Sequence, residues 1–124
     1  MNRPEPKREG YFDFEKLIVY KKAMALRRLI QPLTSKPPRK AAKLVDELDR
    51  AVDSVLLNVP EGCGRPPLSK GRREFYRKAL GSAKEAGSSL NILGVKGQVQ
   101  EDMAKGARRL LLEIVRMLEA MIRK

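Results

Sequence analysis

The sequence contains no histidine, no tryptophan and only one cysteine, Cys63. Without histidine, the chain lacks the most common general base and the most common metal ligand. One cysteine anchors no zinc site and forms no internal disulfide, which is typical of a reducing compartment. We therefore expect a cytoplasmic protein that is not an enzyme, with no catalytic residues, no metal site and no cofactor.

Long apolar runs are also missing. No stretch approaches the roughly 18 apolar residues of a membrane span, and the opening "MNRPEPKREGYF" lacks the apolar segment of a signal peptide. We expect no membrane partner. Aromatic residues make up only 5% of the chain, so a core has to be built from aliphatic side chains. This composition favours helices packed on helices over a β-sandwich.

Positive charge is what the chain has in excess. It carries 27 lysines and arginines against 15 acids, a formal net charge of +12 over 124 residues. Such a charge attracts polyanions, of which nucleic acid and anionic membrane are the obvious ones, but it does not determine the fold. A basic surface without any specific ligand is the alternative interpretation.

The length suits a single domain. Residues 1–12 are polar, carry two prolines and are predicted to form a flexible N-terminal tail, whereas 13–124 form the folded domain. The first helix is expected to begin with Asp13 as its N-cap and to end at Pro32 and the following "SKPPR". Its expected apolar positions are Phe14, Leu17, Ile18, Met24, Ala25, Leu29, Ile30 and Leu33.

The second helix has the clearest helical pattern. Its apolar residues recur at steps of three and four, whereas acids occupy the outward side. The apolar positions are Ala41, Val45, Leu48, Val52, Val55 and Val59. Pro60 falls near the expected end of this helix.

A third helix is predicted to begin with Ser69 as its N-cap. Its core positions are Phe75, Ala79, Ala83, Ala86, Leu90 and Leu93. Gly81 and Gly87 also lie inside it, and glycine costs about 1 kcal/mol in a helix interior. We interpret them as points where another helix approaches closely; a frayed or kinked helix is the alternative.

The fourth helix is expected from Gln98 or Glu101 to the end of the sequence. It carries two apolar rows, the first of Met103, Ala107, Leu110, Ile114, Met117 and Met121, and the second of Leu111, Val115, Leu118 and Ile122. Two rows make a face wider than one partner helix needs, so this helix can pack inside its own bundle and also against another subunit. The sum is an all-α fold: an antiparallel, up-down-up-down four-helix bundle.

The positive charge is uneven along the chain. Residues 63–78 hold six bases against the single acid Glu74, a net charge of 6 − 1 = +5. These six are the predicted phosphate contacts: Arg65, Lys70, Arg72, Arg73, Arg77 and Lys78. A second set follows on the first helix: Lys21, Lys22, Arg27 and Arg28. Contacts of this kind give salt-sensitive binding that tolerates many sequences; a merely solvated basic face is the alternative.

Tyr76 lies within the basic stretch and has two interpretations. It either stacks on an unpaired base or packs on a neighbouring helix, and we favour packing. The stretch "NVPEGCGR" at 58–65 is a weak enzyme site, since Glu61 has no partner carboxylate or nucleophile. We interpret Asn58, Glu61, Gly62, Gly64 and Arg65 as a structural or interface motif. In it Gly62 closes the second helix in the left-handed conformation, Asn58 bonds free backbone groups near that end, and Glu61 needs a nearby cation.

Three motifs, in this order, resemble a known bacterial family. They are "DFEKLIVYKKA" at 13–23, "NVPEGCGR" at 58–65 and "EFYRKALGSAKEAGSSL" at 74–90. The family is that of the proteins encoded in intervening sequences of 23S ribosomal RNA genes. The matching residues are Asp13, Phe14 and Leu17, then Asn58, Glu61, Gly62, Gly64 and Arg65, then Ala79, Gly81, Ser82 and Glu85.

The resemblance implies an antiparallel four-helix bundle that assembles into a homo-oligomeric ring, commonly a pentamer. It also implies kinship with the accessory protein of diversity-generating retroelements, a basic pentamer that binds nucleic acid and a reverse transcriptase. We therefore expect a self-associating accessory protein that binds RNA or DNA, with a nucleic-acid enzyme such as a reverse transcriptase as a further partner. The alternative is a protein-interaction scaffold with no nucleic-acid role.

Overall fold

Four long helices and two short 3-10 turns make up the part of the chain that the computed structural model describes, residues 11–124. In chain order they are η1 (Asp13–Lys16), α2 (Ile18–Ser35), η2 (Arg39–Ala41), α3 (Ala42–Cys63), α4 (Lys70–Val95) and α5 (Glu101–Arg123). Most of the predicted tail, residues 1–10, lies outside the described residues. None of the helices in the described part is long and apolar enough to cross a membrane.

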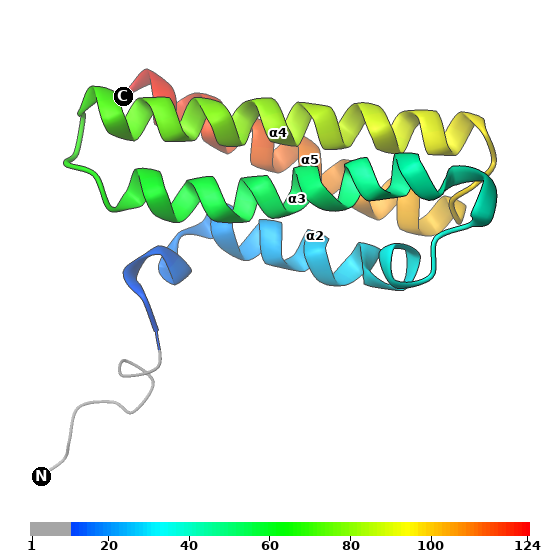
Figure 1. Cartoon of the computed structure of the whole chain (residues 1–124). Coiled ribbons are helices and arrows are strands. Elements are labelled where there is room, and N and C mark those ends of the chain that lie inside the picture. Colours follow the sequence, from blue (N-terminus) through cyan, green and yellow to red (C-terminus); the bar gives the residue numbers. More distant parts are fainter. Residues whose placement is uncertain (1–10) are drawn as a thin grey trace, which may run out of the picture.

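The helices form an antiparallel bundle in which each packs on its neighbours in the sequence (Figure 1). The α3 and α4 helices share the most extensive interface, and α5 returns to pack on α2. Therefore α2 and α4 lie on opposite corners of the bundle. The predicted up-down-up-down four-helix bundle is confirmed. We call the end that holds the start of α2, residues 64–69 and the end of α5 the joint end (Figure 1).

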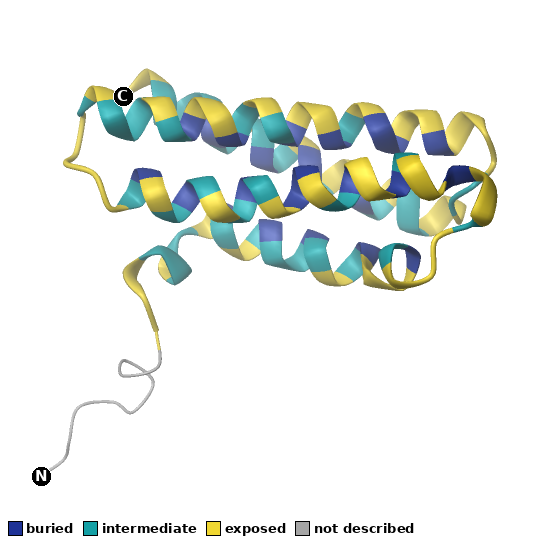
Figure 2. Ribbon diagram, viewed as in Figure 1, coloured by how far each residue is buried: buried dark blue, intermediate teal, exposed yellow. Residues whose placement is uncertain are grey.

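The core is aliphatic and lies on the inward stripe of every helix (Figure 2). The stripe predicted for the second helix is confirmed, because all six of its positions are buried, five of them on α3 and Ala41 at the end of η2. On α4 the stripe from Ala79 to Leu93 is also confirmed, but Tyr76 rather than Phe75 occupies its first core position. Phe75 stays half-buried one position away. The alanines on α4 let α3 approach closely, which accounts for the size of their interface.

The first helix begins later than predicted and runs past Pro32 to the predicted "SKPPR" stop. Asp13 is not the N-cap of a long helix, because residues 13–16 form a separate 3-10 turn whose cap position is Phe12. Pro32 does not end the helix, which continues to Ser35, the first residue of the predicted "SKPPR" stop. A proline in the last turn removes one hydrogen bond, and the side chain of Pro32 is exposed, so the helix tolerates it.

The buried stripe of α2 differs from the predicted one in its first part and agrees with it at Ile30 and Leu33. It consists of Val19, Ala23, Leu26, Ile30 and Leu33. Ile18, which the sequence pattern placed in the core, is 61% exposed. The prediction failed because α2 begins only at Ile18, after an extended residue, so the periodicity does not run continuously from Phe14.

The glycines inside α4 do not mark close helix contacts, and that prediction was wrong. A Cβ atom added at Gly81 or Gly87 would meet no atom within 4 Å. Close approach occurs instead at Gly62 on α3 and at Gly106 on α5, where an added Cβ would lie 3.2 Å from Leu29 Cδ2. The left-handed conformation predicted for Gly62 was also wrong, because Gly62 is helical. Among described glycines, Gly97 has a positive φ, of 66°.

The second apolar row of α5 packs within this bundle, which is one of the two roles expected for so wide an apolar face. Leu111 and Leu118 from that row are buried in the core of this chain, and Val115 and Ile122 are half-buried against it. The row is needed within the bundle because α5 packs on two helices, α2 and α4. Viewed along its axis, α5 meets these two helices on sides that are about a right angle apart. Its apolar face therefore has to be wider than the single seam of a coiled coil. The expected start of this helix at Glu101 is confirmed.

Candidate nucleic-acid interface and the joint beside it

The connection between α3 and α4 is held by one guanidinium group. Arg72 Nε donates to the carbonyl oxygens of Gly62 and Arg65, both at 3.1 Å. Arg72 Nη2 donates to the carbonyl oxygens of Cys63 and Arg65, both at 2.7 Å. The last carbonyls of a helix have no partners within the helix, and charged donors bond them strongly. Arg72 thus caps the end of α3 and ties it to the start of α4.

The start of α4 is fixed by its own cap. The backbone N–H of Arg72 donates to Ser69 Oγ at 3.1 Å, which confirms Ser69 as the N-cap. Arg73 Nη1 donates to the carbonyl oxygen of Leu68 at 2.9 Å. Two of the six predicted phosphate contacts, Arg72 and Arg73, therefore bond the backbone of the connection itself.

Gly62 allows the ring of Tyr76 to lie against α3. A Cβ atom added at Gly62 would lie 2.6 Å from Tyr76 Cε1 and 3.2 Å from the carbonyl oxygen of Arg72. Tyr76 is only 3% exposed, so it packs on the neighbouring helix, as we favoured, and presents no open face to a base. Burial raises the pKa of Tyr76 above its ordinary value of 10.0, although the nearby Arg72 cation acts in the opposite direction.

Asn58 contributes to a different contact from the predicted one. Its amide nitrogen donates to the carbonyl oxygen of Ser54 at 2.9 Å and lies 3.1 Å from Ser54 Oγ. Ser54 Oγ in turn lies 2.6 Å from Ser82 Oγ on α4. Asn58 therefore does not cap the end of α3. It belongs to a half-buried polar chain that links the middle of α3 to α4.

Arg65 is the cation near Glu61. Its Nη2 atom lies 3.7 Å from Glu61 Oε1, and both side chains are largely exposed, so this ion pair adds little stability. The guanidinium carbon of Arg65 also lies 4.8 Å from the centre of the Phe75 ring, as does Lys78 Nζ. Phe75 thus holds two cations at the surface through cation–π contacts. Gly64 ends α3 as its C-cap.

The predicted cations of α2 divide into two groups. Arg27 bonds Asp49 Oδ1 at 2.6 Å and Asp53 Oδ1 at 2.8 Å on α3, and its side chain is only 16% exposed. Lys22 Nζ lies 3.0 Å from Glu113 Oε1 on α5. These two cations connect helices. Lys21 and Arg28 are exposed and form no ion pair with another described residue.

The outer side of α4 beside the joint carries three exposed cations, Lys70, Arg77 and Lys78. None of them forms an ion pair with a described residue, although Glu74 lies on the same helix. Together with Arg65 they form what we call the α4 cation face. Because α2 and α4 are diagonal in the bundle, Lys21 and Arg28 point away from this face. The two predicted sets therefore do not form one continuous surface.

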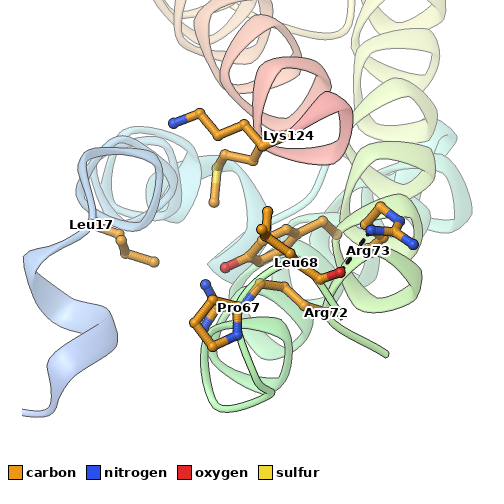
Figure 3. A pocket seen from close by; sticks show the side chains of 8 residues that line it. Leu17, Pro67, Leu68, Arg72, Arg73 and Lys124 are labelled. Carbon is orange, nitrogen blue, oxygen red and sulfur yellow. Dashed lines mark hydrogen bonds between the residues drawn. The ribbon is translucent and has the colours of Figure 1, made fainter. Parts of the chain in front are cut away.

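A hollow at the joint end was not anticipated from the sequence. Its volume is about 350 Å³, and it lies between the start of α2, residues 67–68, the start of α4 and the end of α5 (Figure 3). Leu17, Leu68 and Met121 supply apolar walls, and Arg73 and Lys124 lie at its edge. The helical periodicity contained no signal for it, because its walls come from three stretches far apart in the sequence: Leu17, residues 67–76 and residues 121–124.

Two further observations concern the chemistry of the described residues. Among them, no group of three or more cysteine, aspartate or glutamate side chains is arranged to hold a metal ion. Cys63 is half-buried and free. The polar contacts of Arg72 hold the end of α3 against the start of α4.

The family model of the 23S rRNA-intervening sequence proteins matches residues 15–120. This chain belongs to that family. The match includes the joint motif and the whole α4 cation face, and the resemblance inferred from the three sequence motifs is thereby confirmed. A comparison with curated proteins gives no match. The family name refers to the location of the genes and does not state a biochemical activity.

Proposed function

We propose that this protein is a small, cytoplasmic, non-enzymatic accessory protein that self-associates, as a ring of five copies, and binds nucleic acid through the α4 cation face. The observation that carries the nucleic-acid part is the presence of Lys70, Arg77 and Lys78 on one exposed helix surface without ion-pair partners among the described residues. Unpaired surface cations of this kind bind phosphates and release counterions.

The cations that bond their own backbone or bridge helices are excluded from the proposed contact. Arg72 and Arg27 each hold two parts of the chain together. Arg73 bonds the carbonyl oxygen of Leu68 and is excluded for the same reason. Arg65 lies at the edge of the face and keeps a weak contact with Glu61, so it can serve both the joint and a phosphate.

Self-association rests on the family and on apolar side chains that one copy leaves uncovered. Val95 is 90% exposed at the end of α4, and Leu112 is exposed on α5 beside an open groove that Gly87 and Val115 also line. Five copies would carry 5 × 12 = +60 formal charges, a strong attraction for a polyanion. A reverse transcriptase or another nucleic-acid enzyme is the proposed protein partner.

Fluorescence anisotropy with a labelled RNA hairpin and a labelled DNA duplex tests the nucleic-acid part. The test variant is Lys70→Glu, Arg77→Glu and Lys78→Glu combined. The matched control is Arg39→Glu, Lys40→Glu and Lys43→Glu combined, which changes three exposed cations at the opposite end by the same charge. We expect the test variant to lose at least tenfold in affinity, and its log–log salt slope to fall by roughly 2 to 3.

Equal losses in the two triple variants would show that net charge alone binds nucleic acid and would overturn the assignment to the α4 cation face. No binding by the unmodified protein at low salt would overturn the nucleic-acid function altogether. The protein-interaction scaffold would then be the function to test. Light scattering on the eluted protein tests self-association independently. We expect a mass several times 14.0 kDa, and a monomer at micromolar concentration would exclude the ring.

A further inference from the structure

The hollow at the joint end continues into a second one. A groove of about 440 Å³ lies between the start of α2 and the end of α5, and it shares Leu17 and Met121 with the hollow of Figure 3. Ile18 and Met117 extend its apolar lining. The two together form one open apolar trough across the joint end, which we call the end trough. It does not include Lys70, Arg77 or Lys78.

Leu68 at the edge of this trough has a strained backbone. Its φ of 64° makes it the one non-glycine residue with a positive φ in the described chain. A side chain in this conformation costs about 1–2 kcal/mol, which glycine would avoid. The strain nevertheless holds a leucine side chain 68% exposed to solvent. Strained residues of this kind cluster at binding sites, where the surrounding structure maintains them.

The rim of the end trough is positively charged. Lys16, Arg73 and Lys124 line it together with Arg72, and none of the described residues that line it is acidic. An apolar floor with a cationic rim complements a ligand that combines aliphatic side chains with carboxylates. A nucleic acid fits less well, because its bases would stack on aromatic rings, and the one aromatic among the described residues that line the trough, Tyr76, is only 3% exposed.

We propose that the end trough binds an acidic, amphipathic segment of a partner protein. Two aliphatic side chains of that segment occupy the trough beside Leu68 and Ile18, and flanking carboxylates pair with Lys16, Arg73 and Lys124. This surface is separate from the α4 cation face, so one copy binds nucleic acid and an acidic protein segment at the same time.

The chain itself offers no better occupant. Residues 1–10 carry three cations and two acids, with Met1 as their one large apolar side chain. The acidic side of α3 on a second copy is already neutralised, because Asp49 and Asp53 pair with Arg27 and Asp46 pairs with Arg50. A partner with unpaired carboxylates therefore complements the rim more fully than another copy does.

Selection from a phage-displayed library of random peptides against the purified protein tests this proposal. We expect enriched peptides with two aliphatic residues flanked by aspartate or glutamate. Binding of these peptides should weaken at least tenfold in Leu68→Gly. Leu57→Ser, which removes a leucine that is 70% exposed on α3, is the control and should bind them as the unmodified protein does. Because glycine relieves the strain at this position, Leu68→Gly should unfold at the same temperature or higher, so that lost binding does not reflect lost folding.

Several outcomes would overturn the proposal. These are an absence of enriched peptides, peptides without acidic residues, and equal binding by Leu68→Gly. A lower mass of Leu68→Gly in light scattering would identify a second copy as the occupant. Weaker RNA binding by Leu68→Gly would identify nucleic acid as the occupant. The triple α4 variant separates the two proposals: it should lose RNA binding and keep peptide binding.

Discussion

The joint between α3 and α4 and the outer side of α4 use the same kind of residue for different purposes. At the joint, Arg72 directs its guanidinium at three backbone carbonyls. Five residues further along, Arg77 is exposed and pairs with no described acid. The two arginines are alike in the sequence, so charge alone does not distinguish a structural cation from a binding one. The direction in which each residue leaves its helix decides between them.

The largest expected difference between a variant and its control concerns the close packing at the joint, with a net loss of up to about 2 kcal/mol in Gly62→Ala against a gain of up to about 1 kcal/mol in Gly81→Ala. Gly62→Ala places a Cβ atom against the Tyr76 ring and a backbone carbonyl. Overpacking costs about 1–3 kcal/mol, and alanine returns about 1 kcal/mol in helix propensity. Gly81→Ala has free space around it, so it should raise the free energy of unfolding by up to about 1 kcal/mol. Urea unfolding should therefore give opposite signs for the two variants. The same sign for both would mean that the joint is not tightly packed.

Removing the cap at the joint should have the next largest effect. Arg72→Gln loses charged hydrogen bonds to the end of α3, and we expect a loss of about 2 kcal/mol in the free energy of unfolding. Arg77→Gln serves as the control and should change it by less than about 0.5 kcal/mol. Thermal unfolding of both variants measures the difference. Comparable losses would show that Arg77 also has a structural role.

The same comparison extends to α2, where two neighbouring arginines differ. Arg27→Ala breaks the bonds to Asp49 and Asp53 and leaves both carboxylates without their cation. Since these groups are partly exposed, we expect a loss of about 1 kcal/mol, reduced by salt. Arg28→Ala, at the exposed position beside it, should be close to neutral. Denaturant unfolding of both variants at low and high ionic strength tests this expectation. An unchanged free energy of unfolding in Arg27→Ala would contradict the proposed bridge.

The smallest effect depends on pH. Because burial raises the pKa of Tyr76 in the folded state, the unfolded chain loses this proton first as the pH rises above 10.0. The folded state then binds more protons, so stability falls between the unfolded and the folded pKa. Tyr76→Phe should match the unmodified protein near pH 8 and become relatively more stable at about pH 11. Denaturant unfolding at the two pH values measures this difference.

The sequence was sufficient to predict the bundle because each helix has a marked apolar stripe and proline or glycine separates most of them. The stripe of α3 and the cap at Ser69 could be predicted because they depend on residues close together in the sequence. The start of α2 could not, since one extended residue after η1 shifts its register. The close packing at Gly62 could not be predicted either, because it depends on Tyr76, fourteen positions later on another helix.

For the candidate site, the sequence identified the basic stretch but did not show which of its cations bond the chain itself and which are exposed. Lys70, Arg77 and Lys78 remain in the proposed interface, whereas Arg72 turned out to bond the backbone. That bond requires the end of α3 and the start of α4 to meet at one angle, which no local pattern encodes. The end trough could not be predicted from the sequence either, because α2 and α5 form it only after the bundle closes.

The alanine stripe of α4 also bears on how the chain folds. It gives α3 and α4, which are neighbours in the sequence, the largest interface in the bundle. Contacts between nearby segments form with a small loss of chain entropy, and folds rich in them fold fast. The α3–α4 hairpin is therefore the expected folding nucleus. On this pathway α2 and α5 dock afterwards, and the end trough is among the last surfaces to be completed.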